Sequence, residues 1–229
     1  INQDTRTFMS RGYLLPGQSV EDRIRLIAQR TQEILGKEGI ADRVGEVISK
    51  GWMSLSSPVW SNFGTERGLP ISCNNSYFED NMDSILTKVA EIGKQTQKGA
   101  GTSAYFGKIR PRGSAISSGG TSEGPVHFMG LLESTIDIVS QSNIRRGNCA
   151  VYLDVDHPDI MEFLECREQG NHIQSLSLGV CISDDWMNQM INGDQQKLAV
   201  WGRILKKRFE SGYPYIFWTD AANRQAPQP

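Results

Sequence analysis

The sequence predicts an α/β fold that is preceded by a small helical region. Two amphipathic helices with a period of 3.6 residues lie between residues 19 and 51, ahead of the expected strand–helix–strand unit. Residues 149–182 then have the pattern strand, helix, strand, with a crossover of the length that joins parallel strands. Two more helices and a strand at 212–218 follow, so helices and strands alternate along the C-terminal part of the chain.

The composition is that of an ordinary globular protein and restricts the class of partner. The 229 residues include 24 Lys and Arg and 26 Asp and Glu, which gives a formal net charge of −2. The two signs are interleaved, so we expect neither nucleic acid nor an anionic membrane as a partner. No apolar run is long enough to span a bilayer and no secretory signal is visible, so we expect a cytoplasmic protein. We expect both ends of the chain to be cuts through a longer protein.

The N-terminal region contains the clearest helix signals. Residues 1–18 have no sustained period and are expected to be irregular. Ser19 begins a helix, with Asp22 placed to form a near capping box, and Gly36 ends it. A second amphipathic helix follows directly. We therefore assign residues 1–52 to an N-terminal helical region.

The pattern changes after this region. Residues 53–75 are rich in Ser, Pro, Gly and Asn and are expected to form a surface loop, although so long a loop is either functional or misassigned. Helices are predicted at about 83–98 and 125–140. The apolar residues of the second helix cover more than one face. We therefore expect that helix to be buried on two sides, by its own core and by a second subunit.

The C-terminal part is expected to alternate between strands and helices. Asp156 is expected to cap the first of these helices, with Pro158 in its first turn. The expected order is strand 149–155, helix 156–167, strand 173–182, helices 183–191 and 195–210, and strand 212–218.

Two glycine-rich stretches are candidates for phosphate binding. Gly99-Ala100-Gly101 and Gly119-Gly120 allow the backbone to approach a ligand closely and to point N–H groups at it. Neither stretch matches a Walker or dinucleotide-binding pattern, and each, taken alone, is more typical of a plain turn. Arg110 and Arg112 favour the phosphate hypothesis because a guanidinium fits phosphate oxygens, whereas the alternative is that both are simply solvated.

The basic segment Arg145-Arg146 lies where a helix gives way to a strand. It is either a functional loop or a helix C-terminus whose dipole is complemented by cations.

The four cysteines form no CxxC pair, and with three histidines they offer no metal-ligand spacing, so no metal site is expected. Cys73 lies in a polar Ser/Asn-rich setting, where an accessible thiol can be redox active. We expect the other three thiols to be reduced and buried; they are Cys149, Cys166 and Cys181.

Seven short motifs occur in order over roughly residues 50–225. They are SLSSP (54–58) with SC (72–73), DNMDSI (80–85), GAGTS (99–103) with IRPRG (109–113), GGTSEGPV (119–126), RGNCAVYL (146–153) with HPDI (157–160), SLGV (177–180) and ESGYPYI (210–216). Together they resemble the catalytic barrel of ribonucleotide reductase large subunits, of a bacterial or phage class I type.

This resemblance implies a ten-stranded α/β barrel, of which residues 53–229 would supply the first half. It also implies reduction of ribonucleoside di- or triphosphates to deoxyribonucleotides by radical chemistry. In the family, the radical comes from a metal-containing small subunit or, in related enzymes, from adenosylcobalamin. A reductant of the thioredoxin or glutaredoxin type restores the enzyme, and no cofactor is expected on this chain itself.

The resemblance carries catalytic and substrate roles onto individual residues. Cys73 falls on the first of two cysteines that reduce the 2′ position and form a disulfide, and its partner is expected outside this chain. The substrate-binding positions are Ser57, Ser72, Ala100 and Gly101, which hold phosphate and ribose largely through backbone and hydroxyl groups.

The resemblance also implies an allosteric site for a deoxynucleoside triphosphate or ATP. Asp80, Ser84 and Arg110 fall on effector-binding positions, with Asp80 reading the effector and Arg110 binding its phosphates. Ser117 stands where several relatives have a second arginine, so phosphate contacts are expected to be redistributed. The expected homodimer pairs helices 83–98 and 125–140 with their symmetry mates. The positions implied for the loop that relays effector identity are Arg145 and Arg146.

Two departures from the family pattern leave alternatives open. The Asn-Leu-Cys-x-Glu motif, which holds the radical cysteine and the acid/base carboxylate, does not occur in the sequence. The region between Ile182 and Tyr213 is also shorter than in many relatives. The chain is therefore expected to act with the remainder of a catalytic subunit. The alternatives are a non-catalytic nucleotide-binding or regulatory fragment and a cobalamin-dependent reductase of the same fold.

Overall fold

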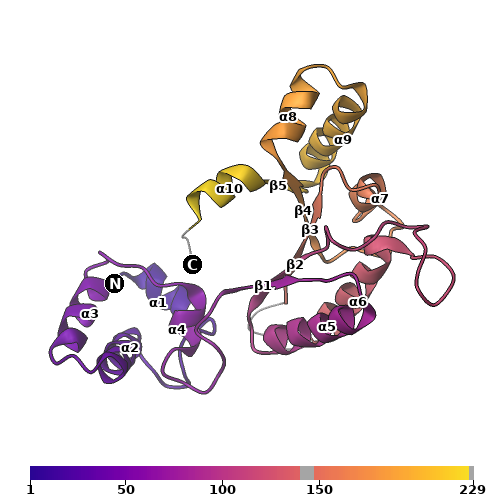
Figure 1. Cartoon of the computed structure of the whole chain (residues 1–229). Helices are drawn as coiled ribbons and strands as arrows, with labels where there is room; N and C mark the ends of the chain where they lie inside the picture. The colour runs from indigo at the N-terminus through magenta and orange to yellow at the C-terminus, as the bar shows by residue number, and fades with distance from the viewer. Residues whose placement is uncertain (140–146, 227–229) are drawn as a thin grey trace. The chain divides into compact units, whose positions relative to one another are not determined.

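The structure is a computed structural model that describes residues 1–139 and 147–226. It divides into two compact units, shown in Figure 1, which we describe separately. The first unit comprises residues 1–74 and 98–100, and the second contains the sheet and its covering helices. Among the described residues, none of the helices combines the length and apolar character needed to cross a membrane.

The first unit is built from four helices around a small apolar cluster. Ser19 accepts the Asp22 N–H at 3.1 Å while the Asp22 carboxylate accepts the Ser19 N–H at 3.2 Å, so the expected capping box is complete. Gly36 ends that helix in the left-handed conformation, as expected. The four helices are α1 (Gln3–Ser10), α2 (Val20–Leu35), α3 (Ile40–Ser49) and α4 (Ser57–Asn62).

Two expectations for this unit were wrong. Residues 1–18 contain α1, which is capped by Asn2, and residues 53–75 contain α4 and the start of a strand. Helix α4 is too short to show a period, and a tertiary contact completes it. The buried Arg23 guanidinium of α2 donates to three carbonyls at the end of α4, at 2.6–3.1 Å. The last carbonyls of a helix lack a full set of partners within it, and here a residue far away in sequence supplies the donor.

The second unit is a five-stranded sheet in the order β1-β2-β3-β4-β5, in which β2 to β5 run parallel. The expected α/β fold with parallel strands is therefore confirmed. The strands are β1 (Cys73–Tyr77), β2 (Gly101–Tyr105), β3 (Cys149–Asp154), β4 (Ser177–Ile182) and β5 (Tyr215–Trp218). The helices are α5 (Met82–Gln97), α6 (Gly124–Val139), α7 (Ile160–Glu165), α8 (Asp184–Ile191), α9 (Gln195–Ser211) and α10 (Thr219–Gln225).

Several expected elements differ in the structure. Strands β1 and β2 and helix α10 were not predicted. The sequence of β1 is a polar pentapeptide and that of β2 begins with glycine, so neither has the apolar alternation that indicates a strand. Strand β4 begins at residue 177, later than the expected 173. Asp156 does not cap α7, whose N-cap is Asp159. The intervening residues form a turn in which the His157 N–H donates to the Asp154 carbonyl at 3.1 Å.

The two faces of the sheet differ in burial. Alternate residues of β3 are fully buried against the helices, and they are Cys149, Val151 and Leu153. The residues between them are only partly buried, and a polar and aromatic surface results. We call this surface the open face; it includes Asn75, Tyr77, Ser103, Tyr105, Tyr152, Asp154, Tyr215 and Phe217.

Candidate functional site

A pocket of about 450 Å³ lies in the second unit, between the start of α5, the start of α6 and the loop that joins β2 to α6. Three residues singled out in the sequence line it together: Asp80, Arg110 and Ser117. The other lining residues are Asn81, Met82, Ile85, Ile116, Ser118, Thr121, Ser122, Glu123, His127 and Phe128.

Asp80 and Arg110 form the charged centre of this pocket. The Arg110 Nε donates to Asp80 Oδ2 at 2.6 Å, and the Arg110 backbone N–H donates to Oδ1 at 3.2 Å. The Arg110 Nη1 also donates to the Ala115 carbonyl at 2.7 Å. Both side chains are about one third exposed, so the pair is partly solvated and faces the pocket. The pocket thus offers a carboxylate and a guanidinium side by side.

The two serines predicted for this site lie in different places. Ser117 is exposed in the loop before Gly119-Gly120, both of which have positive φ and form a tight turn. Ser84 lies in the first turn of α5, and its Oγ accepts the Glu79 N–H at 3.1 Å. Ser84 thereby orders the turn that carries Asp80 but does not line the pocket, and its role in effector binding stays a prediction.

The chemistry of the pocket suits a ligand with an apolar ring and polar groups. Phe128 and Ile85 supply apolar surface, Arg110 can bind an anion, and Asp80 can accept hydrogen bonds from hydroxyl or amino groups. Sequence reasoning missed the α6 residues of this pocket. The Gly119-Gly120 turn was the signal that could have placed them, because it folds the loop back toward α6.

The residues predicted to bind substrate lie mostly in the first unit. Ser57 is exposed in the first turn of α4, Ser72 is half-buried just before β1, and Ala100 is buried. Gly101 begins β2. Within the first unit, a Cβ on Gly68 would lie 2.7 Å from the Lys98 carbonyl oxygen, so the glycine-rich segment packs closely on the loop after α4.

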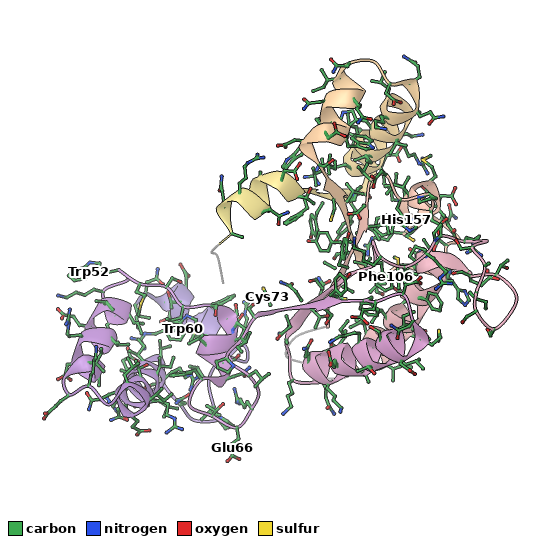
Figure 2. All side chains as sticks on the ribbon, viewed as in Figure 1. Trp52, Trp60, Glu66, Cys73, Phe106 and His157 are labelled. Atoms are coloured by element: carbon green, nitrogen blue, oxygen red, sulfur yellow. The ribbon has the colours of Figure 1, made fainter. Side chains whose placement is uncertain are left out.

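Cys73 differs from the other three cysteines in its surroundings. It is exposed at the first position of β1, where Figure 2 labels it. Burial raises the pKa of the Cys149 thiol to about 11. Burial likewise raises the pKa values of Cys166 and Cys181 to about 12. The thiolate is the reactive form, so these three thiols are poorly suited to redox chemistry near neutral pH.

The open face carries a hydrogen-bonded pair that the sequence did not suggest. The Tyr105 hydroxyl donates to Asp154 Oδ2 at 2.6 Å, and burial together with this bond raises the pKa of Tyr105. A Cβ on Gly107 would lie 2.3 Å from the Tyr105 hydroxyl oxygen, so only glycine leaves room for the pair. Gly179 similarly makes room for the Tyr152 ring.

The specificity-loop residues Arg145 and Arg146 lie outside the described residues. Just beyond them, Asn148 is held by two neighbouring strands. Its carbonyl accepts the Thr102 N–H at 3.0 Å, and its side-chain oxygen accepts a hydrogen bond from Ser177 Oγ at 3.2 Å.

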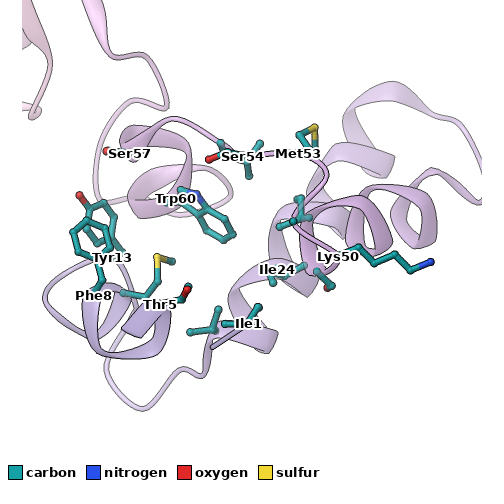
Figure 3. Close-up of a pocket in the computed structure, with 16 residues that line it drawn as sticks. Ile1, Thr5, Phe8, Tyr13, Ile24, Lys50, Met53, Ser54, Ser57 and Trp60 are labelled. Atoms are coloured by element: carbon teal, nitrogen blue, oxygen red, sulfur yellow. The ribbon is translucent and has the colours of Figure 1, made fainter. Parts of the chain in front are cut away.

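A second cavity, of about 490 Å³, lies within the first unit (Figure 3). Its lining is mainly apolar and includes Tyr13, Ile24 and Trp60, and Ser57 also belongs to it. Over residues 1–139 and 147–226, no group of three or more His, Cys, Asp and Glu side chains is arranged to hold a metal ion.

Comparisons with known proteins agree on one family. The family model for the ribonucleotide reductase barrel domain matches residues 71–200. A putative ribonucleoside-diphosphate reductase large subunit of Frog virus 3 is 29% identical over 208 residues, covering 82% of this chain and 36% of the relative. A vitamin B12-dependent ribonucleoside-diphosphate reductase of Mycobacterium tuberculosis is 30% identical over 206 residues, covering 82% of this chain and 30% of the relative.

A solved structure is similar over almost the whole chain. The class Id ribonucleotide reductase alpha subunit of Actinobacillus ureae matches with a TM-score of 0.91 and 45% sequence identity. The match covers 99% of this chain and 42% of that subunit. The chain therefore spans less than half the length of each of these relatives.

Proposed function

Because the chain belongs to the ribonucleotide reductase barrel-domain family, we propose that it is part of a catalytic subunit that reduces ribonucleotides to deoxyribonucleotides by radical chemistry. The observation that carries this proposal is the position of Cys73. It is the exposed cysteine of the chain and lies at the start of a strand, whereas the other three are buried with raised pKa values.

Cys73 supplies one of the two thiols that reduce the substrate. Two thiols give up two electrons and two protons and become a disulfide, while the 2′-hydroxyl leaves the ribose as water. The Asn-Leu-Cys-x-Glu motif is absent from these 229 residues, so the partner thiol, the radical cysteine and the carboxylate come from the remainder of the catalytic subunit. A thioredoxin- or glutaredoxin-type reductant then restores the two thiols.

The substrate is a ribonucleoside di- or triphosphate. Ser57 and Ser72 contribute hydroxyl groups, and Ala100 and Gly101 contribute backbone N–H groups to phosphate and ribose. This assignment is supported by the exposure of Ser57 in the first turn of α4, which follows a serine N-cap and contains Pro58.

The pocket beside α5 and α6 binds the effector, a deoxynucleoside triphosphate or ATP. Arg110 binds its phosphates, Asp80 accepts hydrogen bonds from the sugar or base, and Ser117 adds a hydroxyl at the rim. Ser84 acts on this site by ordering the turn before α5. The pairing of Asp80 with Arg110 supports this assignment, because both groups line one pocket with apolar surface behind them. The identity of the effector is relayed by the loop that contains Arg145 and Arg146.

Helices α5 and α6 form the interface of a homodimer. Support comes from apolar side chains that stay exposed on both helices; Leu86 is 53% and Ile138 is 65% exposed. A groove lined by Leu86, Val89 and Val139, among others, runs between the helices. A second copy would cover the same patch on both subunits, as an isologous dimer requires.

The protein acts in the cytoplasm. The four thiols are unpaired, which suits that reducing compartment.

The radical comes from a metal-containing small subunit. The 45% identity to a class Id alpha subunit over 99% of this chain favours this source over adenosylcobalamin, because the vitamin B12-dependent relative is 30% identical. Omitting the small subunit from a complete assay, and separately replacing it with adenosylcobalamin, distinguishes the two sources.

The experiment that tests the function measures deoxynucleotide formation from a ribonucleoside diphosphate. We expect no turnover by the chain alone, and turnover when it is joined with the remainder of a class Id catalytic subunit, its small subunit and a dithiol reductant. In that assembly Cys73→Ser should abolish turnover, while Cys166→Ser should keep most of it. Equal losses from the two substitutions would contradict the role of Cys73.

A non-catalytic nucleotide-binding module is the second candidate. It is favoured by the pocket in the second unit, which Asp80, Arg110 and Ser117 line together. Under this alternative, deoxynucleoside triphosphate binding would be retained but the reconstituted assembly would form no deoxynucleotide.

A further inference from the structure

One wall of the effector pocket is a short hairpin, residues 113–122, which we call the pocket hairpin. Two backbone hydrogen bonds close its base, from Gly113 N–H to the Ser122 carbonyl and from Ser122 N–H to the Ser114 carbonyl, both at 2.8 Å. Two more close its tip, from Ile116 N–H to the Gly120 carbonyl at 3.2 Å and from Gly119 N–H to the Ile116 carbonyl at 3.1 Å. Its tip carries Ile116 and Ser117, which line the pocket. A single short hairpin is at best marginally stable on its own, so its position depends on what holds its base.

His157 holds the chain just ahead of the pocket hairpin. This side chain is 7% exposed and lies in the turn between β3 and α7, where Figure 2 labels it. Its Nδ1 lies 3.1 Å from the Asp159 backbone nitrogen, which can only donate, so Nδ1 is the acceptor. The proton of the neutral ring is then on Nε2, which donates to the Ile109 carbonyl at 2.9 Å. Ile109 directly precedes Arg110, the phosphate-binding residue.

Asp159 and Glu162 hold the residue at the base of the pocket hairpin. The Arg112 backbone N–H donates to Asp159 Oδ2 at 2.8 Å. The Arg112 guanidinium donates to both oxygens of Glu162, at 3.1 and 2.7 Å, and also pairs with Glu123 on the far side of the hairpin. One arginine thus ties both ends of the pocket hairpin to α7.

The hairpin base and the start of α7 pack closely at Gly124. Gly124 has a φ of +77°, and a Cβ there would lie 2.5 Å from Asp159 Oδ2 and 2.9 Å from the Arg112 nitrogen. The two strands of the hairpin base and the α7 N-terminus therefore meet in direct contact. A shift of the β3–α7 turn would therefore displace the base of the pocket hairpin.

We infer that His157 and Asp159 are positioning residues for the effector pocket, which set the place of Arg110 and of the pocket hairpin without lining the pocket themselves. This role presupposes the nucleotide site proposed above. The turn that contains them directly follows β3, and β3 directly follows the segment assigned to the specificity loop. The β3–α7 turn thus connects the pocket hairpin to the strand that follows the specificity loop in the sequence.

Two substitutions of one residue separate this role from a general loss of packing. In His157→Gln the amide nitrogen reaches about as far as Nε2 and keeps a donor for the Ile109 carbonyl. In His157→Asn the side-chain oxygen keeps an acceptor for the Asp159 N–H, but the bond to Ile109 is lost. The probe is deoxythymidine triphosphate, with its affinity measured by calorimetry. We expect His157→Asn to weaken binding about five- to tenfold, as for one lost buried hydrogen bond, and His157→Gln to stay within about twofold of the wild type.

A second pair of variants avoids the buried site. Glu162→Gln removes the carboxylate that pairs with Arg112, and Glu168→Gln removes the one that pairs with Arg203 and Lys207 on α9. Both carboxylates are partly exposed, and each makes two charged contacts: Glu162 with two nitrogens of Arg112, and Glu168 with Arg203 and Lys207. Glu162→Gln should weaken deoxythymidine triphosphate binding, whereas Glu168→Gln should leave it unchanged.

Hydrogen exchange at the Gly113 and Ser122 amides tests the positioning without any ligand. Exchange should be faster in His157→Asn than in the wild type and unchanged in His157→Gln. Equal exchange in all three proteins, or equal weakening of binding by Glu162→Gln and Glu168→Gln, would overturn the inference. If the wild type binds no deoxythymidine triphosphate, or if Arg110→Ala binds it as tightly as the wild type, the assignment of the pocket is wrong. In that case the exchange rates of the Gly113 and Ser122 amides still test whether the β3–α7 turn positions the hairpin.

Discussion

Strands β1 and β4 each carry one cysteine, and the two thiols differ because the strands occupy different places in the sheet. Strand β1 lies at the edge, has the polar sequence Cys-Asn-Asn-Ser-Tyr, and leaves Cys73 exposed. In β4 all six residues are buried, and burial raises the pKa of the Cys181 thiol to about 12. The comparison teaches that the position of a strand in the sheet sets how exposed its cysteine is, and thereby how readily the thiol reacts.

The largest expected effect is on thiol modification. With a water-soluble disulfide reagent at pH 7, we expect one thiol per chain, Cys73, to react at least about a hundredfold faster than the rest, because a pKa near 11 leaves so little thiolate. Because the pKa values of the buried thiols are raised, only a small fraction of each is thiolate at pH 7, and this fraction grows as the pH rises. Any reaction of the buried thiols should therefore rise about tenfold per pH unit between pH 7 and their pKa values.

Cys73→Ser is the control for this experiment, since it should remove the fast phase and leave the slow phase unchanged. A second fast thiol in the folded Cys73→Ser protein would break the contrast between the edge and the centre of the sheet.

The next effect is on stability. Leu178→Ala in β4 removes a side chain with no exposed surface and should lower the free energy of unfolding by about 2–5 kcal/mol. Tyr77→Ala in β1 removes a ring that is 49% exposed and stacks on Tyr105 with centroids 6.0 Å apart. Its loss should cost about 1 kcal/mol. Urea unfolding followed by circular dichroism measures both values, and a larger cost for Tyr77→Ala would show that β1 belongs to the core.

The smallest expected effect sharpens the comparison at the edge itself. Ser103 Oγ of β2 donates to Asn75 Oδ1 of β1 at 2.6 Å. Ser103→Ala should lower the free energy of unfolding by only about 0.5–1.5 kcal/mol. Hydrogen exchange should quicken at the amides of β1 and stay the same at those of β4. Quicker exchange throughout the sheet would instead mean that β1 and β4 unfold together.

Local chemistry in the sequence determined several parts of this protein. The capping box of Ser19 and Asp22 and the left-handed Gly36 set both ends of α2, because each signal acts within a few residues. The strand–helix–strand pattern of residues 149–182, with its crossover length, likewise predicted the parallel strands β3 and β4. The polar setting of Cys73 correctly indicated an exposed thiol. Motif resemblance brought Asp80, Arg110 and Ser117 together as one site, and all three line one pocket.

Only the tertiary structure decided the parts whose stabilising partners are distant in sequence. Helix α4 depends on Arg23, which lies 36–40 residues away from the carbonyls that it caps. Strand β2 starts with a glycine and has no strand pattern, yet pairing with β3 supplies its hydrogen bonds. The pocket hairpin is held by His157 and Asp159, 47–48 residues from the backbone groups that they contact. A sequence pattern reports interactions between near neighbours, so contacts made only when distant segments pack together leave no signal in it.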